Sequence, residues 1–337
     1  MAEDFFNQPK AYDAVISNGS QNLPPMSGVV LGGIEGIKQR LTSSLESQRI
    51  IALRDALEYR EAGLGLVIQA LKDESWQVRG AAYLLLRQRS EPSVKQALQK
   101  YIATVMIAWW RLDETEGHTA VDSVGTNHGT IYGSTHTPLA PGILPGLGGA
   151  LYFDGMNDYV EVPDAPALNF GTGDLSIWVW IKTSKTSGID VIVDKRVETS
   201  GPVQGYVACN YSGNLLFQLA DGLGSGWTNY DSKFFIADGK WHQVAITVDR
   251  DLIDGGRWYV DGVEVGKRFN PTGRQGCLSN PKPLRIGKRS DHPGWPGFFK
   301  GSIGDLRLFN RALSATEIQA IYKGSNAKKW GETNRKV

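Results

Sequence analysis

The spacing of apolar residues changes near residue 105, and this change constrains the fold more than any other feature. Before it, apolar side chains recur at three- and four-residue steps, as at Val78, Ala82 and Leu85, which is the period of a helix. After it, runs rich in valine, isoleucine, tryptophan and tyrosine show alternation, as in residues 241–248, which is the period of a strand. A chain of 337 residues with such a change predicts two domains, a helical one followed by a β domain.

The β part carries a clear hairpin signal. Asp261-Gly262 stands between the strand-like runs 257–260 and 263–265, and Asp-Gly in that position favours a tight two-residue turn. Clusters of Gly, Pro, Asn and Asp separate the many other strand candidates. Short strands with such frequent turns predict a two-sheet antiparallel sandwich rather than a parallel sheet.

The helical part shows an internal repeat. Residues 68–71 align with residues 95–98 at a spacing of 27, and Arg49 aligns with Arg79 at a spacing of 30. Helical units repeated at this spacing are typical of an α-solenoid. The segments SQRIIALRDALEY, GLVIQALKD and WQVRGAAYLLLRQR resemble HEAT-like repeats of phycobilin lyases and of cyanobacterial multidomain proteins. An unspecialised small helical bundle is the alternative.

The β part resembles a known family across residues 106–323. The motifs that carry the resemblance occur in the family's order: IAWWRLDETEGHTAVDSVGTNHGTI, LYFDGMNDYVEVPDAPALNF, DLSIWVWIK, DGKWHQVAITVD, WYVDGVEVG, LRIGKR and GSIGDLRLFNRALSATEIQAIY. They resemble the laminin-G-like jelly rolls of the concanavalin A-like lectin/glucanase class. The resemblance implies a jelly-roll sandwich, but this fold hosts lectins, protein-binding modules, calcium-dependent modules and glycanases, so it leaves the function open.

These observations divide the chain into four segments. We expect a leader at residues 1–26, a HEAT-like domain at 27–104, a concanavalin A-like jelly roll at 105–325 and a basic tail at 326–337. The first residues lack the apolar stretch of a signal peptide, and no run approaches the roughly 18 apolar residues of a membrane span. We therefore expect a cytoplasmic protein.

Charge and cysteine content limit the partners further. The formal net charge of +1 argues against a nucleic-acid partner. Only Cys209 and Cys277 are present, which excludes a disulfide scaffold and a cysteine-rich zinc site. The two could pair, but two unpaired, buried thiols fit a cytoplasmic protein better.

The sequence offers little for catalysis. A glycan hydrolase needs two carboxylates that flank the scissile bond, so the residues should share one face of a strand. The close match is Asp113-Glu114-Thr115-Glu116, which we place in a turn with its carboxylates in solvent. The histidines lack metal-binding spacing, and no nucleophile elbow or phosphate loop is present. We predict that the protein is not an enzyme.

One possible metal site remains. Calcium takes six to eight oxygen ligands, and many laminin-G-like domains hold such an ion at the rim of the sandwich. The loop at 154–158 supplies Asp154, Asn157 and Asp158, and the family resemblance places Asp305 nearby. A calcium ion on these four residues is one expectation. The alternative is that Asp154 and Asp158 only cap a turn through backbone amides.

Tryptophans suggest the ligand-binding residues. Those in strand runs are expected to pack in or on the sandwich: Trp109, Trp110, Trp178, Trp180, Trp241 and Trp258. Two others lie in Gly/Pro-rich segments, where binding groups often sit. The resulting candidates are Trp227 with Tyr230 and Asp221, and Trp295 with Arg289 and Asp291. Loop tryptophans that fold back as lids are the alternative.

The favoured function is a non-catalytic recognition or adaptor protein. In this reading the jelly roll binds a carbohydrate or protein ligand, and the helical repeats dock a protein partner. The main alternative is a structural or linker subunit of a large assembly such as a light-harvesting antenna. A glycan hydrolase or a bilin lyase accessory is less favoured, because the carboxylate pattern is poor and the repeats are few.

Overall fold

The computed structural model describes residues 33–86, 89–138, 149–223 and 226–326. The chain divides into two compact units, Met1–Thr104 and Val105–Val337. The predicted leader at 1–26 lies outside the described residues, as does the predicted tail except for Asn326, the last residue of a helix. The two units are described separately below.

The first unit consists of short helices. Their bounds are α1 Gly33–Leu41, α2 Glu46–Ala56, η2 Leu57–Tyr59, α3 Arg60–Gln69, η3 Ala70–Lys72, α4 Trp76–Leu86 and α5 Pro92–Val105. Their apolar stripes face one another, and Ala52, Val67 and Val78 are fully buried. Among the described helices, none is both long and apolar enough to cross a membrane. The helical fold is confirmed, and its HEAT-like organisation stays a prediction.

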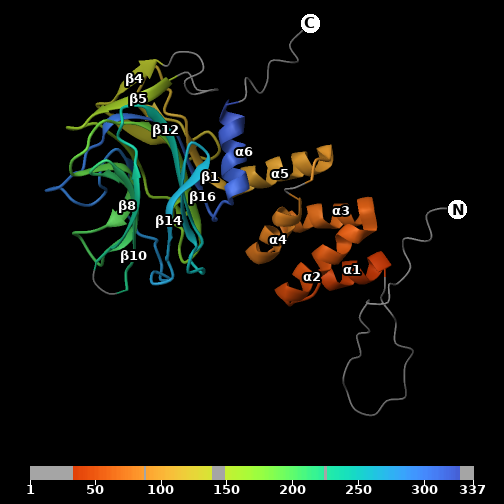
Figure 1. Ribbon diagram of the computed structural model, residues 1–337. Helices are drawn as coiled ribbons and strands as arrows, with labels where there is room; N and C mark the ends of the chain where they lie inside the picture. The colour runs from red at the N-terminus through yellow and green to blue at the C-terminus, as the bar shows by residue number, and fades with distance from the viewer. Residues whose placement is uncertain (1–32, 87–88, 139–148, 224–225, 327–337) are drawn as a thin grey trace, which may run out of the picture. The chain divides into compact units, whose positions relative to one another are not determined.

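The second unit is an antiparallel β-sandwich, as predicted. Sheet A has the order β14-β13-β12-β7-β16-β5-β4, with β1 also paired to β16, and sheet B has the order β11-β10-β9-β8-β15-β6-β3-β2. Figure 1 shows the sheets as two layers, with β8 and β10 in one and β12, β14 and β16 in the other. The strands of sheet A are β1 Met106–Trp110, β4 Thr135–Pro138, β5 Gly149–Asp154, β7 Leu175–Lys182, β12 Trp241–Val248, β13 Gly256–Val260, β14 Val263–Phe269 and β16 Lys300–Phe309. The strands of sheet B are β2 Thr119–Ala120, β3 Gly129–Tyr132, β6 Tyr159–Val162, β8 Ile189–Val197, β9 Gln204–Tyr211, β10 Asn214–Asp221, β11 Thr228–Phe235 and β15 Leu284–Ile286.

The core lies between the two sheets. Alternation along β7 sends Ile177, Val179 and Ile181 inward, and alternation along β10 sends Phe217 and Leu219 inward from the opposite sheet. A short 3-10 turn, η4 Pro166–Leu168, also contributes to this core. Burial of so many apolar side chains is the main driving force for the fold. The inner face of each sheet therefore packs in the core. The outer faces of the two sheets are covered by different elements, which are described below.

The hairpin between β13 and β14 confirms the sequence prediction. Val260 pairs with Val263, and Asp261 and Gly262 between them have φ values of 52° and 78°. Positive φ at both positions is what a type I′ turn requires. A side chain at Gly262 would also collide with Tyr322, because its Cβ would lie 2.8 Å from that ring.

A C-terminal helix, α6 Ala315–Asn326, covers part of the outer face of sheet A (Figure 1). Ser314 and Glu317 cap its first turn reciprocally, since Glu317 N–H donates to Ser314 Oγ and Ser314 N–H donates to Glu317 Oε2. Tyr322 on this helix stacks on Trp180 of β7, with ring centroids 5.9 Å apart. The helix thus buries aromatic surface that the strands turn away from the core.

Both cysteines are free thiols. Cys209 is buried on the outer side of sheet B with Val191, Val207 and Leu216, and burial raises the pKa of its thiol to about 12. Cys277 is exposed, so the expectation of two buried thiols is correct only for Cys209. The small apolar cluster around Cys209 lies under a loop that is described next.

Candidate functional site

A row of charged side chains follows the outer face of β8. Asp194, Arg196 and Glu198 alternate along the strand and its end, so all three project from the same face. Arg196 Nε lies 2.8 Å from Asp194 Oδ2, and Arg196 Nη2 lies 3.4 Å from Glu198 Oε2. Arg196 also donates to Gln218 Oε1 of β10 at 2.7 Å. We call Asp194, Arg196 and Glu198 the β8 row.

Residues 288–298 form a loop, here called loop 288–298, that crosses this face. Val191 N–H donates to Gly297 O at 2.9 Å, which ties one end of the loop to β8. Ser290 Oγ donates to Asp194 Oδ1 at 2.7 Å, and Arg289 Nη1 lies 3.4 Å from both oxygens of Glu198. The loop is therefore fixed on the β8 row by polar contacts along its length.

The loop seals one carboxylate of the row and leaves the other partly open. The side chain of Asp194 is fully buried, whereas that of Glu198 is 16 % exposed. Burial, only partly offset by the Arg196 charge, raises the pKa of Asp194 to about 6. Arg289 Nε is also buried and finds no hydrogen-bond partner in the described part of the chain, and Arg196 Nη2 has only its ion pair with Glu198. A ligand can thus reach Glu198 without rearrangement but not Asp194.

Asp291 holds the end of β8. Its Oδ2 accepts backbone N–H groups of Glu198 at 2.9 Å, Thr199 at 3.0 Å and Ser200 at 3.1 Å, and Oδ1 lies 3.0 Å from Lys282 Nζ. Burial alone would raise the pKa of Asp291, but these donors outweigh burial and hold the pKa well below its usual range. Asp291 positions the site and does not offer a free carboxylate to a ligand.

Trp227 joins the same site from the other side. Its ring lies over the Arg196 guanidinium, with the centroid 4.6 Å from Cζ, a cation–π geometry. Arg274 holds the segment that carries Trp227, because it donates to Thr228 Oγ1 at 2.8 Å, to Gly226 O at 3.0 Å and to Asp221 Oδ1 at 3.0 Å. Trp227 is half-buried. Trp227 therefore folds back over Arg196, as in the alternative interpretation of a loop tryptophan.

Two predicted ligand-binding residues are structural. Tyr230 was placed in a loop, and this placement is wrong: it lies in β11 opposite Phe217, faces the core and stacks on Phe269 at 4.2 Å. The strand begins at Thr228, directly after the glycine-rich run, so alternation turns Tyr230 inward. Asp221 is buried and accepts Gly276 N–H at 3.0 Å in addition to its Arg274 contact.

Trp295 is the most solvent-accessible large aromatic near the site. It stands in a tight turn closed by a hydrogen bond from its own N–H to His292 O at 3.2 Å, and its side chain is 71 % exposed. The structure thus brings Trp227, Arg289 and Asp291 together around the end of β8, and Trp295 projects from the same loop as Arg289 and Asp291. The sequence reasoning missed Asp194 and Glu198, although acidic residues at i and i+4 of one strand face were a usable signal.

The predicted calcium residues do not form one site. Asp154 Oδ1 accepts the N–H groups of Met156 at 2.7 Å and Asn157 at 3.3 Å, and Asp158 Oδ2 accepts Asp154 N–H at 2.8 Å. These bonds are those of a capped turn. Burial and the Asp154 charge raise the pKa of Asp158. Across the described residues, no group of three or more His, Cys, Asp or Glu side chains could hold a metal ion.

Asp305 lies far from that turn, which corrects its expected place. Lys300 pairs with Asp154, so Asp305 is five residues further along β16, roughly 16 Å away at the usual strand rise. Its carboxylate is occupied by Trp109 Nε1 at 2.6 Å and by Arg307 at 2.7 and 2.8 Å. Calcium binding at the 154–158 loop stays a prediction, now without Asp305. The side chains of Asp154, Asn157 and Asp158 alone supply fewer oxygen atoms than the six to eight ligands that calcium takes.

The acidic turn after β1 also differs from its prediction. Glu116 is exposed as expected, but Glu114 is half-buried and accepts Val121 N–H at 2.9 Å. Burial raises the pKa of Glu114, and its second oxygen is buried without a hydrogen-bond partner among the described residues. Asp113 forms an ion pair with Arg111 at 2.7 Å. The three carboxylates thus have different environments and do not form an acid–base pair.

Comparison with known proteins agrees with this architecture. Residues 154–319 match a laminin-G model of the concanavalin A-like lectin/glucanases superfamily. The sandwich is an antiparallel jelly roll that is similar to those of this superfamily. A search of curated protein sequences gave no match.

Solved structures show the same fold at low identity. The binding domain of Paraclostridial Mosquitocidal Protein 1 is 15 % identical with a TM-score of 0.51, over 66 % of this chain and 53 % of that one. The botulinum neurotoxin serotype D ligand binding domain, solved with N-acetylneuraminic acid, is 17 % identical with a TM-score of 0.50, over 67 % of this chain and 52 % of that one. The chain spans about half the length of these binding domains. At such identity the likeness establishes the jelly-roll fold alone.

Proposed function

We propose that the jelly roll is a non-catalytic carbohydrate-binding module whose ligand lies on the outer face of sheet B, beside the end of β8 and loop 288–298. The observation that carries this proposal is the 71 % exposed Trp295 on a loop whose base is fixed by Asp291, Arg289 and Gly297. Sugar rings stack on aromatic faces, and an exposed aromatic on a rigid base binds with little loss of entropy.

Polar groups at the end of β8, which the loop carrying Trp295 contacts, suit the same ligand. Glu198 is partly open to solvent between Arg196 and Arg289, so it can accept hydrogen bonds from sugar hydroxyls. A few fixed polar groups beside an aromatic surface are typical of small-molecule sites. A jelly-roll domain of similar fold was solved in complex with N-acetylneuraminic acid, which supports a sugar as the ligand class here.

The β8 row argues against hydrolysis at this site. A retaining or inverting glycosidase needs two carboxyl groups that both reach the glycosidic bond. Asp194 is sealed beneath loop 288–298, and its nearest charge is Arg196. Glu198 alone cannot supply both an acid and a nucleophile or base. The proposed role of the row is to fix the loop that presents Trp295.

The test is glycan binding by the full chain and by Trp295→Ala, measured on a glycan array and then by calorimetry with the best oligosaccharide. An aromatic anchor of this kind typically contributes about 2 kcal/mol or more, so we expect affinity to fall at least tenfold with an unchanged melting temperature. Ile253→Ala is the matched control, because Ile253 is 69 % exposed on a different loop. Equal glycan binding by wild type and Trp295→Ala would overturn the proposed site, and binding of no glycan would overturn the proposal in favour of a protein ligand.

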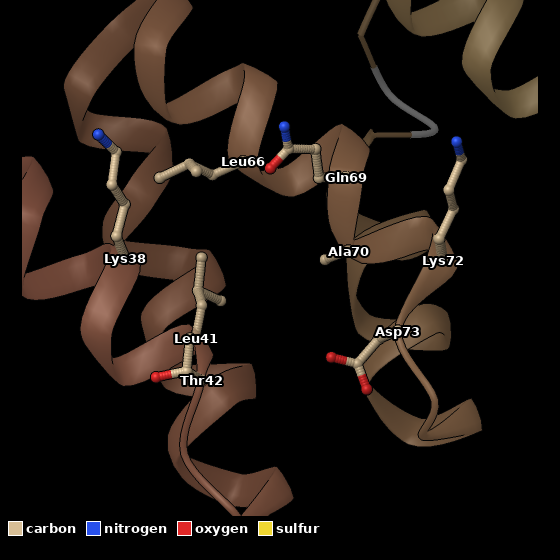
Figure 2. Close-up of a pocket in the computed structure, with 8 residues that line it drawn as sticks. All are labelled: Lys38, Leu41, Thr42, Leu66, Gln69, Ala70, Lys72 and Asp73. Carbon is tan, nitrogen blue, oxygen red and sulfur yellow. The ribbon is translucent and has the colours of Figure 1, made fainter.

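We also propose that the helical unit, read as a short HEAT-like module, docks a protein partner. A groove of about 450 Å³ lies between α1 and the α3–η3 segment. Figure 2 shows Leu41 and Leu66 extending into it, with Lys38 on one side and Lys72 on the other. Apolar walls between two lysines suit a helical segment of a partner that carries apolar and acidic side chains.

Affinity capture with the full chain tests this second role. Leu66→Asp should lose the captured partner, whereas Ile51→Asp, at an exposed position outside the groove, should keep it. A partner retained by both variants would contradict docking in the groove. Capture of a large assembly with the chain in fixed stoichiometry would favour the structural or linker role instead.

A further inference from the structure

A second cluster on the outer face of sheet B consists of Tyr132 on β3, Tyr159 on β6, and Phe298 and Lys288 from the two ends of loop 288–298. Tyr132 and Tyr159 stack with centroids 4.6 Å apart and ring planes 14° apart, and Phe298 lies 6.5 Å from Tyr159. We call these three rings the aromatic platform. Tyr132 forms its open end, with 41 % of the residue exposed.

Lys288 sits on this platform without a counter-ion. Its Nζ lies 4.2 Å from the Tyr159 ring centroid and 5.2 Å from that of Phe298. No ion pair or hydrogen bond to its Nζ is formed by the described residues. Burial and the neighbouring Arg285 charge lower the pKa of Lys288. Ring faces make the close contacts of its ammonium, and the Glu161 charge, which raises the pKa of Lys288, acts on it without forming an ion pair.

The neighbouring charges are already matched to each other. Arg285 pairs with Glu161 at 2.7 Å through Nη2 and at 2.8 Å through Nε. Arg285 also donates to Arg289 O at 3.1 Å and Ser290 O at 3.0 Å, which fixes the base of loop 288–298. Glu161 is thus not available to neutralise Lys288, and the cluster has one excess positive charge.

We propose that the aromatic platform and Lys288 form a binding site for an acidic sugar, one that bears a carboxylate or sulfate. The acid group meets Lys288 Nζ beside the Tyr159 and Phe298 rings, and the sugar chain continues past Tyr159 to pack on the exposed ring of Tyr132. A charge-assisted contact to a partly desolvated ammonium is stronger than a neutral hydrogen bond. The inference rests on the proposed glycan-binding function and adds the charge of the ligand and a second set of residues.

The platform can belong to the same extended site as Trp295. In the order β8-β15-β6-β3, β6 is two strands from β8, roughly 10 Å at the usual strand spacing. Loop 288–298 begins at the platform with Lys288 and passes over the β8 row before it returns to the platform with Phe298. An oligosaccharide of a few residues spans such a distance, so one ligand can contact Trp295 with one sugar and Lys288 with another.

The test compares glycans that share one backbone and differ only in a terminal carboxylate or sulfate. Lys288→Gln in the full chain should lower the affinity for the acidic form at least tenfold and leave the neutral form unchanged. Lys288→Arg should retain most of the preference, because it keeps the charge. Binding of the acidic form should weaken with added salt. Lys240→Gln, which removes a 79 % exposed lysine elsewhere, is the matched control, and melting temperatures confirm folding.

Further measurements distinguish failure of the acidic-sugar inference from failure of the proposed glycan-binding function. Inorganic sulfate should compete only weakly, because it lacks the ring that packs on Tyr132; strong competition would overturn the sugar and leave a simple anion site. Equal loss of acidic and neutral binding in Lys288→Gln, or no loss at all, would also overturn the inference. If Trp295→Ala still abolishes binding in that case, the proposed function survives without the acidic specificity. Failure of every glycan to bind overturns both.

Discussion

The outer faces of the two sheets are built from similar side chains but are used differently. On sheet A, β7 turns Trp178 and Trp180 outward; Trp178 lies 6.0 Å from the Arg307 guanidinium, and Trp180 is stacked against Tyr322 of α6. Both tryptophans are buried. On sheet B, Tyr132 and Trp295 stay exposed. Trp180 is therefore a packing residue beneath α6, whereas Tyr132 and Trp295, which no helix among the described residues is seen to contact, are candidate binding residues.

Trp180→Ala should give the largest effect and tests the packing half of this comparison. Removing a buried tryptophan typically costs about 3–5 kcal/mol of unfolding free energy, and the variant also deprives Tyr322 of its stacking partner. Denaturant unfolding measures the loss. Trp295→Ala is the counterpart on sheet B and should change stability by less than about 0.5 kcal/mol. Similar losses in both variants would show that the two faces are packed alike.

Asp291→Asn should have a smaller effect, confined to sheet B. The substitution removes a charged acceptor from three backbone N–H groups and from Lys282, which should cost about 1–3 kcal/mol. Because the pKa of Asp291 is lowered in the folded state, its contribution is present above the unfolded pKa and fades as the pH falls through the folded pKa. Unfolding curves at pH 7 and at pH 2–3 should therefore show a smaller difference between variant and wild type at the lower pH. A constant difference would contradict the role assigned to this carboxylate.

The fold was largely predictable because it depends on local patterns. Alternation placed Trp110, Trp178, Trp180 and Trp258 in strand runs that pack, and all four are buried. The Asp-Gly dipeptide gave the β13–β14 hairpin, since only that turn chemistry accepts two successive positive φ values. These features require knowledge of a few neighbouring residues only.

The site was predictable only in part, because it depends on contacts between distant residues. Trp295 and Arg289 were identified from their loop, but Tyr230 was misplaced because the adjoining glycine-rich run suggested a loop where β11 already begins at Thr228. Asp305 was misplaced because the register of β16 against β5, which no single segment reveals, carries it far from Asp154. The contact of Lys288 with Tyr159 joins positions 129 residues apart in the chain, and only the completed sheet brings them together.

The smallest effect we predict is a change in pH dependence. The pKa of buried Asp194 is raised to about 6 in the folded state from 3.8, so the folded protein binds more protons than the unfolded chain between about pH 4 and 6. Its contribution to stability should therefore fall as the pH rises through that window. Asp194→Asn should flatten this slope. Burial also raises the pKa of Asp174, which lies next to sheet A, to about 6. Asp174→Asn is therefore the control, because it removes the contribution of Asp174 to the same pH dependence and leaves that of Asp194. An unchanged slope in Asp194→Asn would show that Asp194 is not sealed as described.

Hydrogen–deuterium exchange of the full chain, with and without a bound glycan, tests the central claim most directly, because it locates the ligand without any substitution. The account predicts slower exchange in peptides that cover residues 288–298, the end of β8, and β3 with β6. Peptides from β7, β14 and α6 should exchange at the same rate in both states. Protection confined to sheet A, or to the helical unit, would contradict the assignment of the outer face of sheet B as the recognition surface.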